Sequence, residues 1–190
     1  MWRWRGAETI FLDASCITYS FHGEALADID YAHRVSVSGL MESGHGVSGR
    51  DGDVAIRHSG DVLDREKHQG VHTININLRG LSDKVGAIYL TISAWTTTLS
   101  EIVRPEIKCF DPDDKSGEPL ARYELDGMPT GADTAVVMAR VWRQRPGARW
   151  NVTAIGERGM GRAGNYGPIH ALIDKCGERA EREKAMKVVT

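Results

Sequence analysis

Cysteine is scarce in this chain and widely spaced. Among its 190 residues only Cys16, Cys109 and Cys176 are cysteines. An odd number with no Cys-x-x-Cys spacing argues against a disulfide framework and against a cysteine-based zinc site. We therefore expect reduced, mostly buried thiols.

Long apolar runs and an excess of charge are also lacking. No stretch reaches the roughly 18 consecutive apolar residues of a membrane helix, and the first residues lack the apolar core of a signal peptide. The formal net charge of −2 provides no general attraction to nucleic acid or to an anionic membrane. These absences predict a soluble, cytoplasmic protein that neither binds nucleic acid nor spans a membrane.

Short β-type runs dominate what is present. In residues 72–78, for example, Ile74, Ile76 and Leu78 alternate with polar residues, which is typical of a strand with one face in a core. Turn-forming residues separate these runs. The predicted strands are Thr9–Tyr19, His33–Ser38, Asp53–His58, Val71–Leu78, Val85–Ala94, Glu106–Phe110, Leu120–Leu125, Ala135–Trp142 and Arg149–Ile155. This spacing favours an all-β protein with an antiparallel β-sandwich.

Only the end of the chain has a helical pattern. Ile169, Leu172, Ile173 and Cys176 recur at helical spacing. Gly177 is expected to end this short helix and to leave a charged tail. The predicted organisation is an N-terminal segment (1–8), a β-sandwich domain (9–165), and the C-terminal helix with its charged tail (166–190).

Two acidic segments are the best functional candidates. Asp13 follows strand-forming residues in Phe11-Leu12-Asp13-Ala14-Ser15, and Asp61 ends the polar turn His58-Ser59-Gly60-Asp61. Carboxylates on loops between strands suit calcium, which takes about six to eight oxygen ligands. Asp13 and Asp61 are the main candidate ligands, and Ser59 and Asp64 are weaker ones. His58 is expected to be a positioning or core histidine.

Other chemistries have weaker support. The segment 159–164 matches Gly-x-Gly-x-x-Gly, but no second strand with an acid for a ribose follows it, so we interpret its glycines as letting the chain cross the end of the sandwich. A hydrolase using His58 and an aspartate lacks an identifiable nucleophile. We therefore expect no enzymatic activity.

Several segments in order resemble the TerD family, the calcium-binding β-sandwich domain associated with tellurium resistance and stress responses. The two acidic segments are followed by matching stretches at 88–94, 120–125, 136–140 and 150–156. The resemblance covers about residues 9 to 160. It implies a two-sheet sandwich that binds calcium at one end through loops, with Asp13 and Asp61 as the positions that carry over.

The chain departs from the family pattern in its acids. Phe11 stands where the family usually has an aspartate, and the run after Asp61 contains Arg65 and Lys67 among its acids. Each lost carboxylate removes a charged ligand, and each added cation repels calcium. The departures predict a reduced calcium affinity or the loss of a site.

The chain also lacks the strand that usually precedes the Asp-Ala-Ser segment. A missing strand leaves backbone groups of its neighbour unpaired. A partner protein, a second copy, or the segment Trp2-Arg3-Trp4-Arg5 could cover that edge, so a homo- or hetero-oligomer is possible.

The sequence as a whole favours a non-enzymatic, calcium-binding β-sandwich module that acts through protein–protein interaction. The alternative is a structural or adaptor subunit of a larger assembly in which metal binding has decayed. The lost acids and the missing strand both favour this second interpretation.

Overall fold

The computed structural model describes residues 1–4, 10–32, 55–103, 105–124 and 131–188, with side chains as far as residue 177. The strands within these ranges are β1 (Trp2–Trp4), β2 (Leu12–Ser20), β3 (Ala25–Ile29), β4 (Ile56–His58), β5 (Val62–Asp64), β6 (Gln69–Val71), β7 (Ile74–Ile76), β8 (Val85–Ala94), β9 (Ile102–Val103), β10 (Glu106–Cys109), β11 (Ala121–Glu124), β12 (Ala135–Trp142) and β13 (Asn151–Gly159). Helix α1 (Gly167–Val188) follows them, and a 3-10 turn (Leu99–Glu101) precedes β9.

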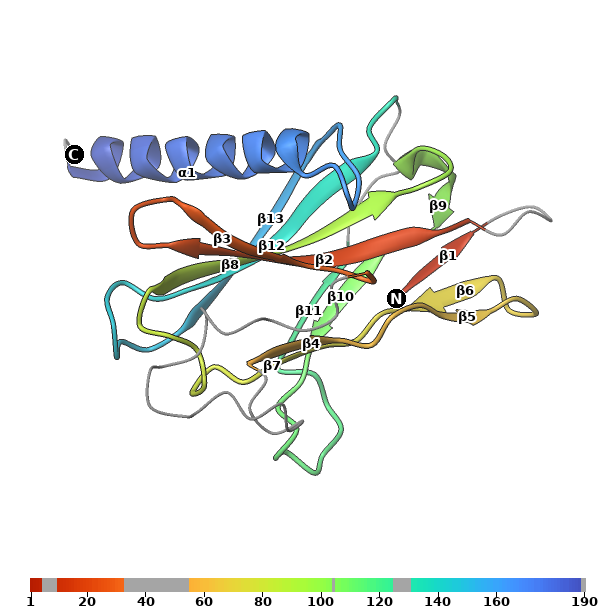
Figure 1. The fold of residues 1–190 in the computed structure, drawn as a ribbon, viewed down its shortest axis with the longest axis horizontal. Coiled ribbons are helices and arrows are strands. Elements are labelled where there is room, and N and C mark those ends of the chain that lie inside the picture. The colour runs from red at the N-terminus through yellow and green to blue at the C-terminus, as the bar shows by residue number, and fades with distance from the viewer. Residues whose placement is uncertain (5–9, 33–54, 104, 125–130, 189–190) are drawn as a thin grey trace.

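A five-stranded antiparallel sheet forms the centre of the molecule (Figure 1). Its strand order is β13-β12-β8-β2-β3. Strand β8 lies in the middle, and all its residues are buried. It is paired on both edges and covered on both faces, which explains why its sequence is an almost continuous apolar run.

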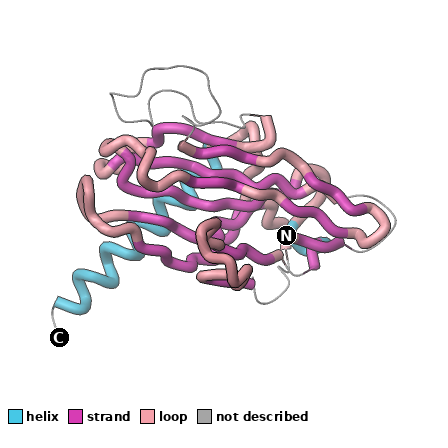
Figure 2. Tube along the Cα trace, turned by 90° about the horizontal axis from the view of Figure 1, so that it is seen from below, coloured by secondary structure: helices cyan, strands magenta, loops and turns pink. Residues whose placement is uncertain are grey.

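Smaller sheets cover one face of the central sheet. They are a four-stranded sheet with the order β5-β6-β1-β9 and the pairs β4-β7 and β10-β11. Figure 1 shows the smaller sheets on one side of the central sheet and the helix on the other, and in Figure 2, seen from below, the strands lie in front of the helix. Two clusters of apolar side chains lie on the covered face, one around Leu12 and Met138 and the other around Cys16 and Ile88. This arrangement is the antiparallel β-sandwich that the strand pattern predicted.

Helix α1 covers the opposite face of the central sheet (Figure 1). Ile169, Leu172 and Ile173 pack there against Ile17 and Val137. The helix continues through Gly177 to Val188, so the predicted end at Gly177 is wrong. A glycine inside a helix costs only about 1 kcal/mol, and the docked first turns supply the nucleus from which the helix continues.

Most of the predicted strands are present, and Val85–Ala94 and Ala135–Trp142 have the expected bounds. The prediction for His33–Ser38 lies outside the described residues. Strands β1, β3, β5 and β9 were not predicted, and Val71–Leu78 is divided into the end of β6 and strand β7. The missed strands are short, and an exposed five-residue strand such as β3 carries little apolar periodicity.

The N-terminal aromatic segment forms a strand of its own. β1 pairs with β6 on one side and with β9 on the other. Trp2 and Trp4 are 2% and 4% exposed. Gly70 makes room for Trp2, because a Cβ at Gly70 would lie only 2.1 Å from the indole ring. The expectation that no strand precedes the Asp-Ala-Ser segment is therefore wrong, because Trp2–Trp4 forms a strand before β2. This segment pairs with β6 and β9, as one of the three coverings proposed for an open edge.

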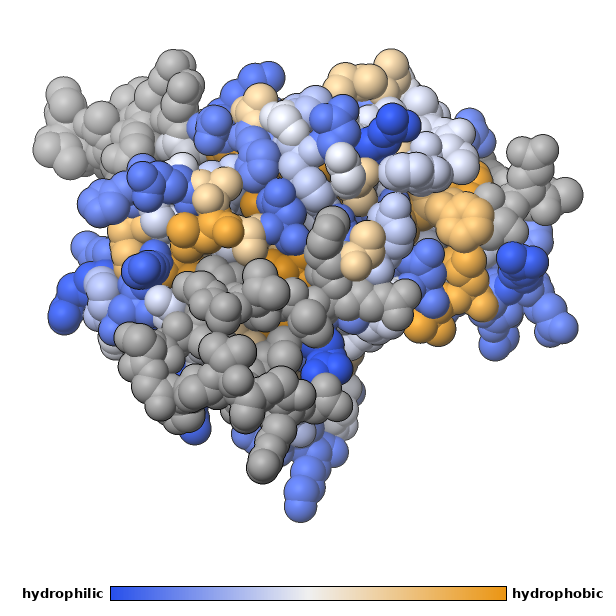
Figure 3. All heavy atoms as spheres, viewed as in Figure 1, coloured by the Kyte–Doolittle hydropathy of each residue, from blue (hydrophilic) through white to orange (hydrophobic). Residues whose placement is uncertain are grey.

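The outer surface shows no large apolar area on the face in Figure 3, where hydrophobic residues appear in small areas among hydrophilic ones. No helix in the described part of the chain has the length and apolarity that a membrane crossing requires. Cys16 is buried, Cys109 and Cys176 are half-buried, and none of the three forms a disulfide.

Candidate functional site

Strand β2 carries Asp13 into the space between the central sheet and the segment that leads to α1. Leu12 and Cys16 point into the sandwich, so alternation places Asp13 and Ser15 on the other face. Asp13 pairs with Ser93 of β8 in register and is only 5% exposed. A carboxylate this deeply buried needs protons, hydrogen bonds or a cation to compensate for its lost hydration.

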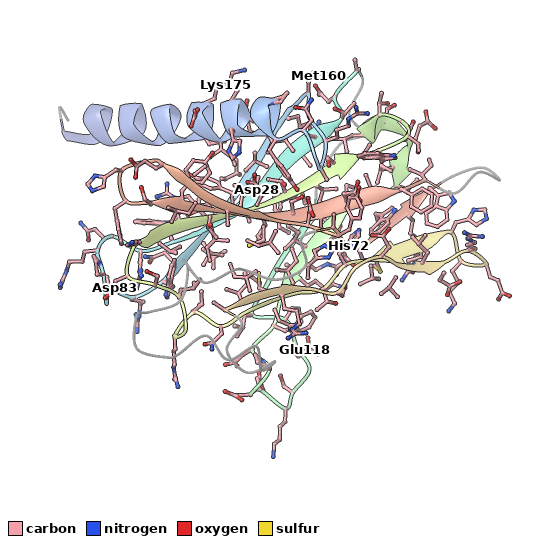
Figure 4. All side chains as sticks on the ribbon, viewed as in Figure 1. Asp28, His72, Asp83, Glu118, Met160 and Lys175 are labelled. Carbon is pink, nitrogen blue, oxygen red and sulfur yellow. The ribbon has the colours of Figure 1, made fainter. Side chains whose placement is uncertain are left out.

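Among the described residues, no strand pairs with one edge of β2 where Asp13 lies. Strand β3 pairs with β2 from Cys16 onward, so the backbone of Leu12 and Ala14 extends past its end. Two histidines approach this edge. The Nε2 atom of His72 donates to the carbonyl oxygen of Leu12 at 2.5 Å, and the imidazole of His58 lies beside the backbone of Ala14. Figure 4 shows His72 between the central sheet and the smaller sheets. The two side chains therefore take the place of a neighbouring strand.

The turn after β4 is built to present Asp61. The backbone N–H of Gly60 donates to Nδ1 of His58 at 2.9 Å, and Gly60 has a φ of 79°, a conformation that favours glycine. The Ser59 hydroxyl donates to the Gly60 carbonyl and accepts from the backbone N–H of Thr73. His58 is 2% exposed, and these contacts confirm it as a positioning histidine.

Asp30 is a second buried carboxylate beside Asp13, whereas Asp61 is exposed. The sequence patterns did not indicate Asp30. It follows β3 and is 1% exposed. Its Oδ1 accepts the backbone N–H of Ala32 at 2.8 Å, and its Oδ2 accepts the Tyr166 hydroxyl at 2.7 Å. The one available signal was the alternation Ala27-Asp28-Ile29-Asp30 after the turn at Gly23, which is typical of a hairpin with β2.

Asp13, Asp30 and Asp61, here called the acidic pole, act on one another electrostatically. Burial raises the pKa of Asp13 from 3.8 to about 7, and the negative charges of Asp61 and Asp30 add to the shift. The pKa of Tyr31 is raised by burial and by the same three carboxylates. The structure therefore brings together Asp13 and Asp61, as predicted, and adds Asp30.

The histidines beside the acidic pole are neutral bases. Burial, together with the charge of the neighbouring His72, lowers the pKa of His58 to about 4. Burial also lowers the pKa of His72, although Nδ1 of His72 lies 3.7 Å from Oδ1 of Asp61. Neutral imidazoles add no positive charge beside the acidic pole at neutral pH.

The weaker candidates Ser59 and Asp64 have other partners. The Ser59 hydroxyl is used within its own turn. Asp64 pairs with Lys67 at 2.9 Å and accepts the backbone N–H of the same lysine. In the part of the chain that the structure describes, no group of three or more His, Cys, Asp or Glu side chains has an arrangement that could hold a metal ion.

The fold and the acidic pole define a class of protein: a β-sandwich with buried carboxylates at the open edge of one strand and a C-terminal helix across its sheet. The sequence pattern of the TerD domain matches residues 48–166, more than half of the chain. The chain belongs to the TerD family. This finding confirms the resemblance drawn from the ordered motifs.

Solved structures share the fold at low sequence identity. One is a homologue of the telluride resistance protein TerD from Streptomyces coelicolor A3(2), with 13% identity, a TM-score of 0.57, and coverage of 85% of this chain and 89% of that one. Another is SAV2460, a protein of unknown function, with 14% identity, a TM-score of 0.56, and coverage of 84% and 85%. No curated protein matches the sequence.

Proposed function

We propose that the protein is a non-enzymatic, calcium-binding module that acts through contacts with other proteins. The observation that carries this proposal is the mutual repulsion within the acidic pole, where burial and two like charges raise the pKa of Asp13 to about 7. A bound cation would relieve this repulsion. Family membership supports the proposal, and we expect the module to serve cytoplasmic stress responses.

The donor chemistry of the acidic pole suits calcium. Calcium is a hard cation that prefers carboxylate, carbonyl and water oxygens and tolerates irregular geometry. Asp13, Asp30 and Asp61 would supply the charged oxygens, and backbone carbonyls and water would complete the shell. When bound, calcium would supply positive charge that orders the loops. Because the described side chains do not complete a metal site alone, we expect a weaker affinity than a fully acidic site provides.

A second candidate function is an adaptor subunit whose metal binding has decayed. The specific observation in its favour is that Asp64 forms an ion pair with Lys67 and Ser59 stabilises its own turn. Each potential oxygen ligand used this way leaves fewer for an ion. The sandwich and its buried core would persist in such a subunit.

The geometry around His58 supports a non-enzymatic role. Its Nδ1 accepts the Gly60 N–H, and its pKa of about 4 makes it a poor proton acceptor near neutral pH. The adjacent Ser59 hydroxyl donates to a backbone carbonyl rather than to a base. A serine held in this way is not activated for nucleophilic attack.

Calcium titration separates the two candidate functions. We expect the wild type to release or take up heat on calcium addition, with a calcium-dependent rise in melting temperature. Asp61→Ala should weaken both signals, because it removes a carboxylate of the acidic pole. The matched control is Asp64→Ala, which removes a carboxylate of the same segment outside the acidic pole and should bind like the wild type.

Two results would reject the calcium proposal. The first is a wild type that shows neither heat nor a melting shift, which would leave the adaptor function. The second is an equal loss of binding in Asp61→Ala and Asp64→Ala, which would indicate diffuse charge attraction rather than a site at the acidic pole.

A further inference from the structure

Helix α1 is attached to the central sheet through two tyrosine hydroxyls as well as through its apolar face. Tyr19 of β2 bonds His170 of α1, with its hydroxyl oxygen 2.5 Å from Nδ1. The other side of that imidazole faces Asp28 of β3, 3.6 Å from Nε2, and Figure 4 shows Asp28 on the side of the sheet that faces the helix. Tyr166, just before the helix, makes the second attachment.

The second attachment ends in the acidic pole. The Tyr166 hydroxyl donates to Oδ2 of Asp30 at 2.7 Å and lies 2.9 Å from the Ser15 hydroxyl, which can donate to it. Oδ1 of Asp30 is bound to the backbone N–H of Ala32. Both oxygens of this buried carboxylate therefore have a donor, and the rotation of the carboxylate about its χ2 angle is fixed.

Tyr166 is itself held by a loop that is anchored beside Asp13. The backbone N–H of Ala163 donates to the hydroxyl of Ser93, the residue opposite Asp13 on β8. The loop is also bound to Thr134, the residue before β12. The Thr134 hydroxyl donates to the carbonyl oxygen of Gly161 and accepts the backbone N–H of Gly161. The loop bearing the predicted Gly-x-Gly-x-x-Gly match thus crosses the end of the sheet, as its glycines indicated.

The glycines of this loop allow close packing under the helix. A Cβ at Gly161 would lie 2.5 Å from Ile169, and one at Gly159 would lie 2.7 Å from Leu172. The carbonyl of Tyr166, the residue before the helix, accepts the backbone N–H of His170 and so ties Tyr166 to the first helical turn. Its hydroxyl is therefore placed by a rigid element and not by a free chain end.

We infer that Tyr166 is a positioning residue for the acidic pole, which fixes the Asp30 carboxylate beside Asp13 and links the start of α1 to the candidate cation site. The inference rests on the proposed calcium function. The contact of Tyr166 with Ser15 and Asp30 distinguishes it from Tyr19, whose hydroxyl bonds His170 instead. Residues that orient metal ligands typically contribute about 10- to 100-fold to metal affinity.

The test compares two tyrosine variants by calorimetric calcium titration. Tyr166→Phe should weaken calcium binding by about 10-fold or more, because one oxygen of Asp30 loses its donor. Tyr19→Phe is the matched control, since it removes the other hydroxyl that attaches α1 but leaves Asp30 untouched. It should bind calcium like the wild type, and a thermal melt of both variants would report any general loss of stability.

A double-variant cycle tests whether Tyr166 acts through Asp30. If it does, Tyr166→Phe should have little further effect on calcium affinity in an Asp30→Asn background, so the two losses are not additive. Additive losses, or equal weakening by Tyr166→Phe and Tyr19→Phe, would overturn the inference. Either result would mean that the hydroxyl only stabilises the helix.

A readout without calcium keeps this inference separate from the proposed function. In chelator-treated protein, the side-chain carboxyl carbon resonance of Asp30 should shift in Tyr166→Phe and remain in place in Tyr19→Phe. An unchanged resonance in Tyr166→Phe would refute the positioning role. If the wild type binds no calcium but the Asp30 resonance still shifts in Tyr166→Phe, the proposed function is refuted and the positioning role stands.

Discussion

Asp13 and Glu106 are both buried strand carboxylates, yet their surroundings have opposite charge. Asp13 is 5% exposed, Glu106 is 3% exposed, and both lie on antiparallel strands. Glu106 has Lys108 and Arg122 at 3.0 Å. Burial alone would raise the pKa of Glu106, but the hydrogen bond and charge of Lys108 together with Arg122 hold it below its ordinary value.

The comparison separates a structural carboxylate from a candidate binding carboxylate. The ion pair of Glu106 with Arg122 joins β10 to β11, and Lys108, on the same strand as Glu106, lies opposite Arg122 in the register of this pair. The acidic pole instead has like charges around Asp13, and burial together with these charges raises its pKa to about 7. A fold keeps such repulsion at a cost in stability, which is typical of functional sites.

The largest expected effect comes from neutralising Asp13. In chelator at about pH 8, Asp13→Asn should raise the free energy of unfolding by about 3 to 4 kcal/mol, because each unit of pKa shift corresponds to roughly 1.4 kcal/mol. Urea unfolding measures this change. A destabilised Asp13→Asn would show that Asp13 is not under net repulsion.

Neutralising Glu106 should have the opposite sign. Glu106→Gln removes the acceptor charge between Lys108 and Arg122 and should lower the free energy of unfolding by about 2 kcal/mol, since both cations are partly exposed and remain hydrated. The same urea experiment applies. If both variants change stability in the same direction, the contrast between the two regions fails.

The pH dependence of stability should reveal two opposing slopes. The pKa of Asp13 is raised in the folded state, so its contribution is full below about pH 4 and is lost as the pH rises through about 7. The pKa of His58 is lowered to about 4, so its contribution is present above its unfolded value of 6.5 and is lost as the pH falls. Between about pH 4 and pH 6.5, the contributions of Asp13 and His58 to the free energy of unfolding therefore change in opposite directions and offset each other in the wild type.

Asp13→Asn should therefore unmask the slope of His58. In this variant, the free energy of unfolding measured in chelator should rise with pH from about 4 to about 6.5, more steeply than in the wild type. Urea unfolding at several pH values checks the change of slope. Parallel pH profiles for the variant and the wild type would rule out the raised pKa of Asp13.

The sequence indicated much of the fold and two members of the acidic pole. The apolar runs of β8 and β12 were found with their bounds because both strands are long and buried. Asp13 and Asp61 could be predicted because each follows an apolar run in a short ordered motif.

The rest depended on contacts between distant residues. Asp30 follows β3, a five-residue strand whose short alternation around Ile29 was too brief to indicate a strand by itself. Tyr166 meets Asp30 across 136 positions of sequence, which no local pattern can indicate. The N-terminal strand β1 is recognisable only from its partners β6 and β9, because three residues are too few for a period.

The most direct test of the acidic pole is the calcium response of stability in the wild type and in Asp13→Asn at about pH 8. Urea unfolding would be measured for both proteins in chelator and in excess calcium. We expect calcium to raise the free energy of unfolding of the wild type and to leave Asp13→Asn nearly unchanged, so that the gap between them narrows. An unresponsive wild type, or an equal rise in both proteins, would contradict a cation site built on Asp13.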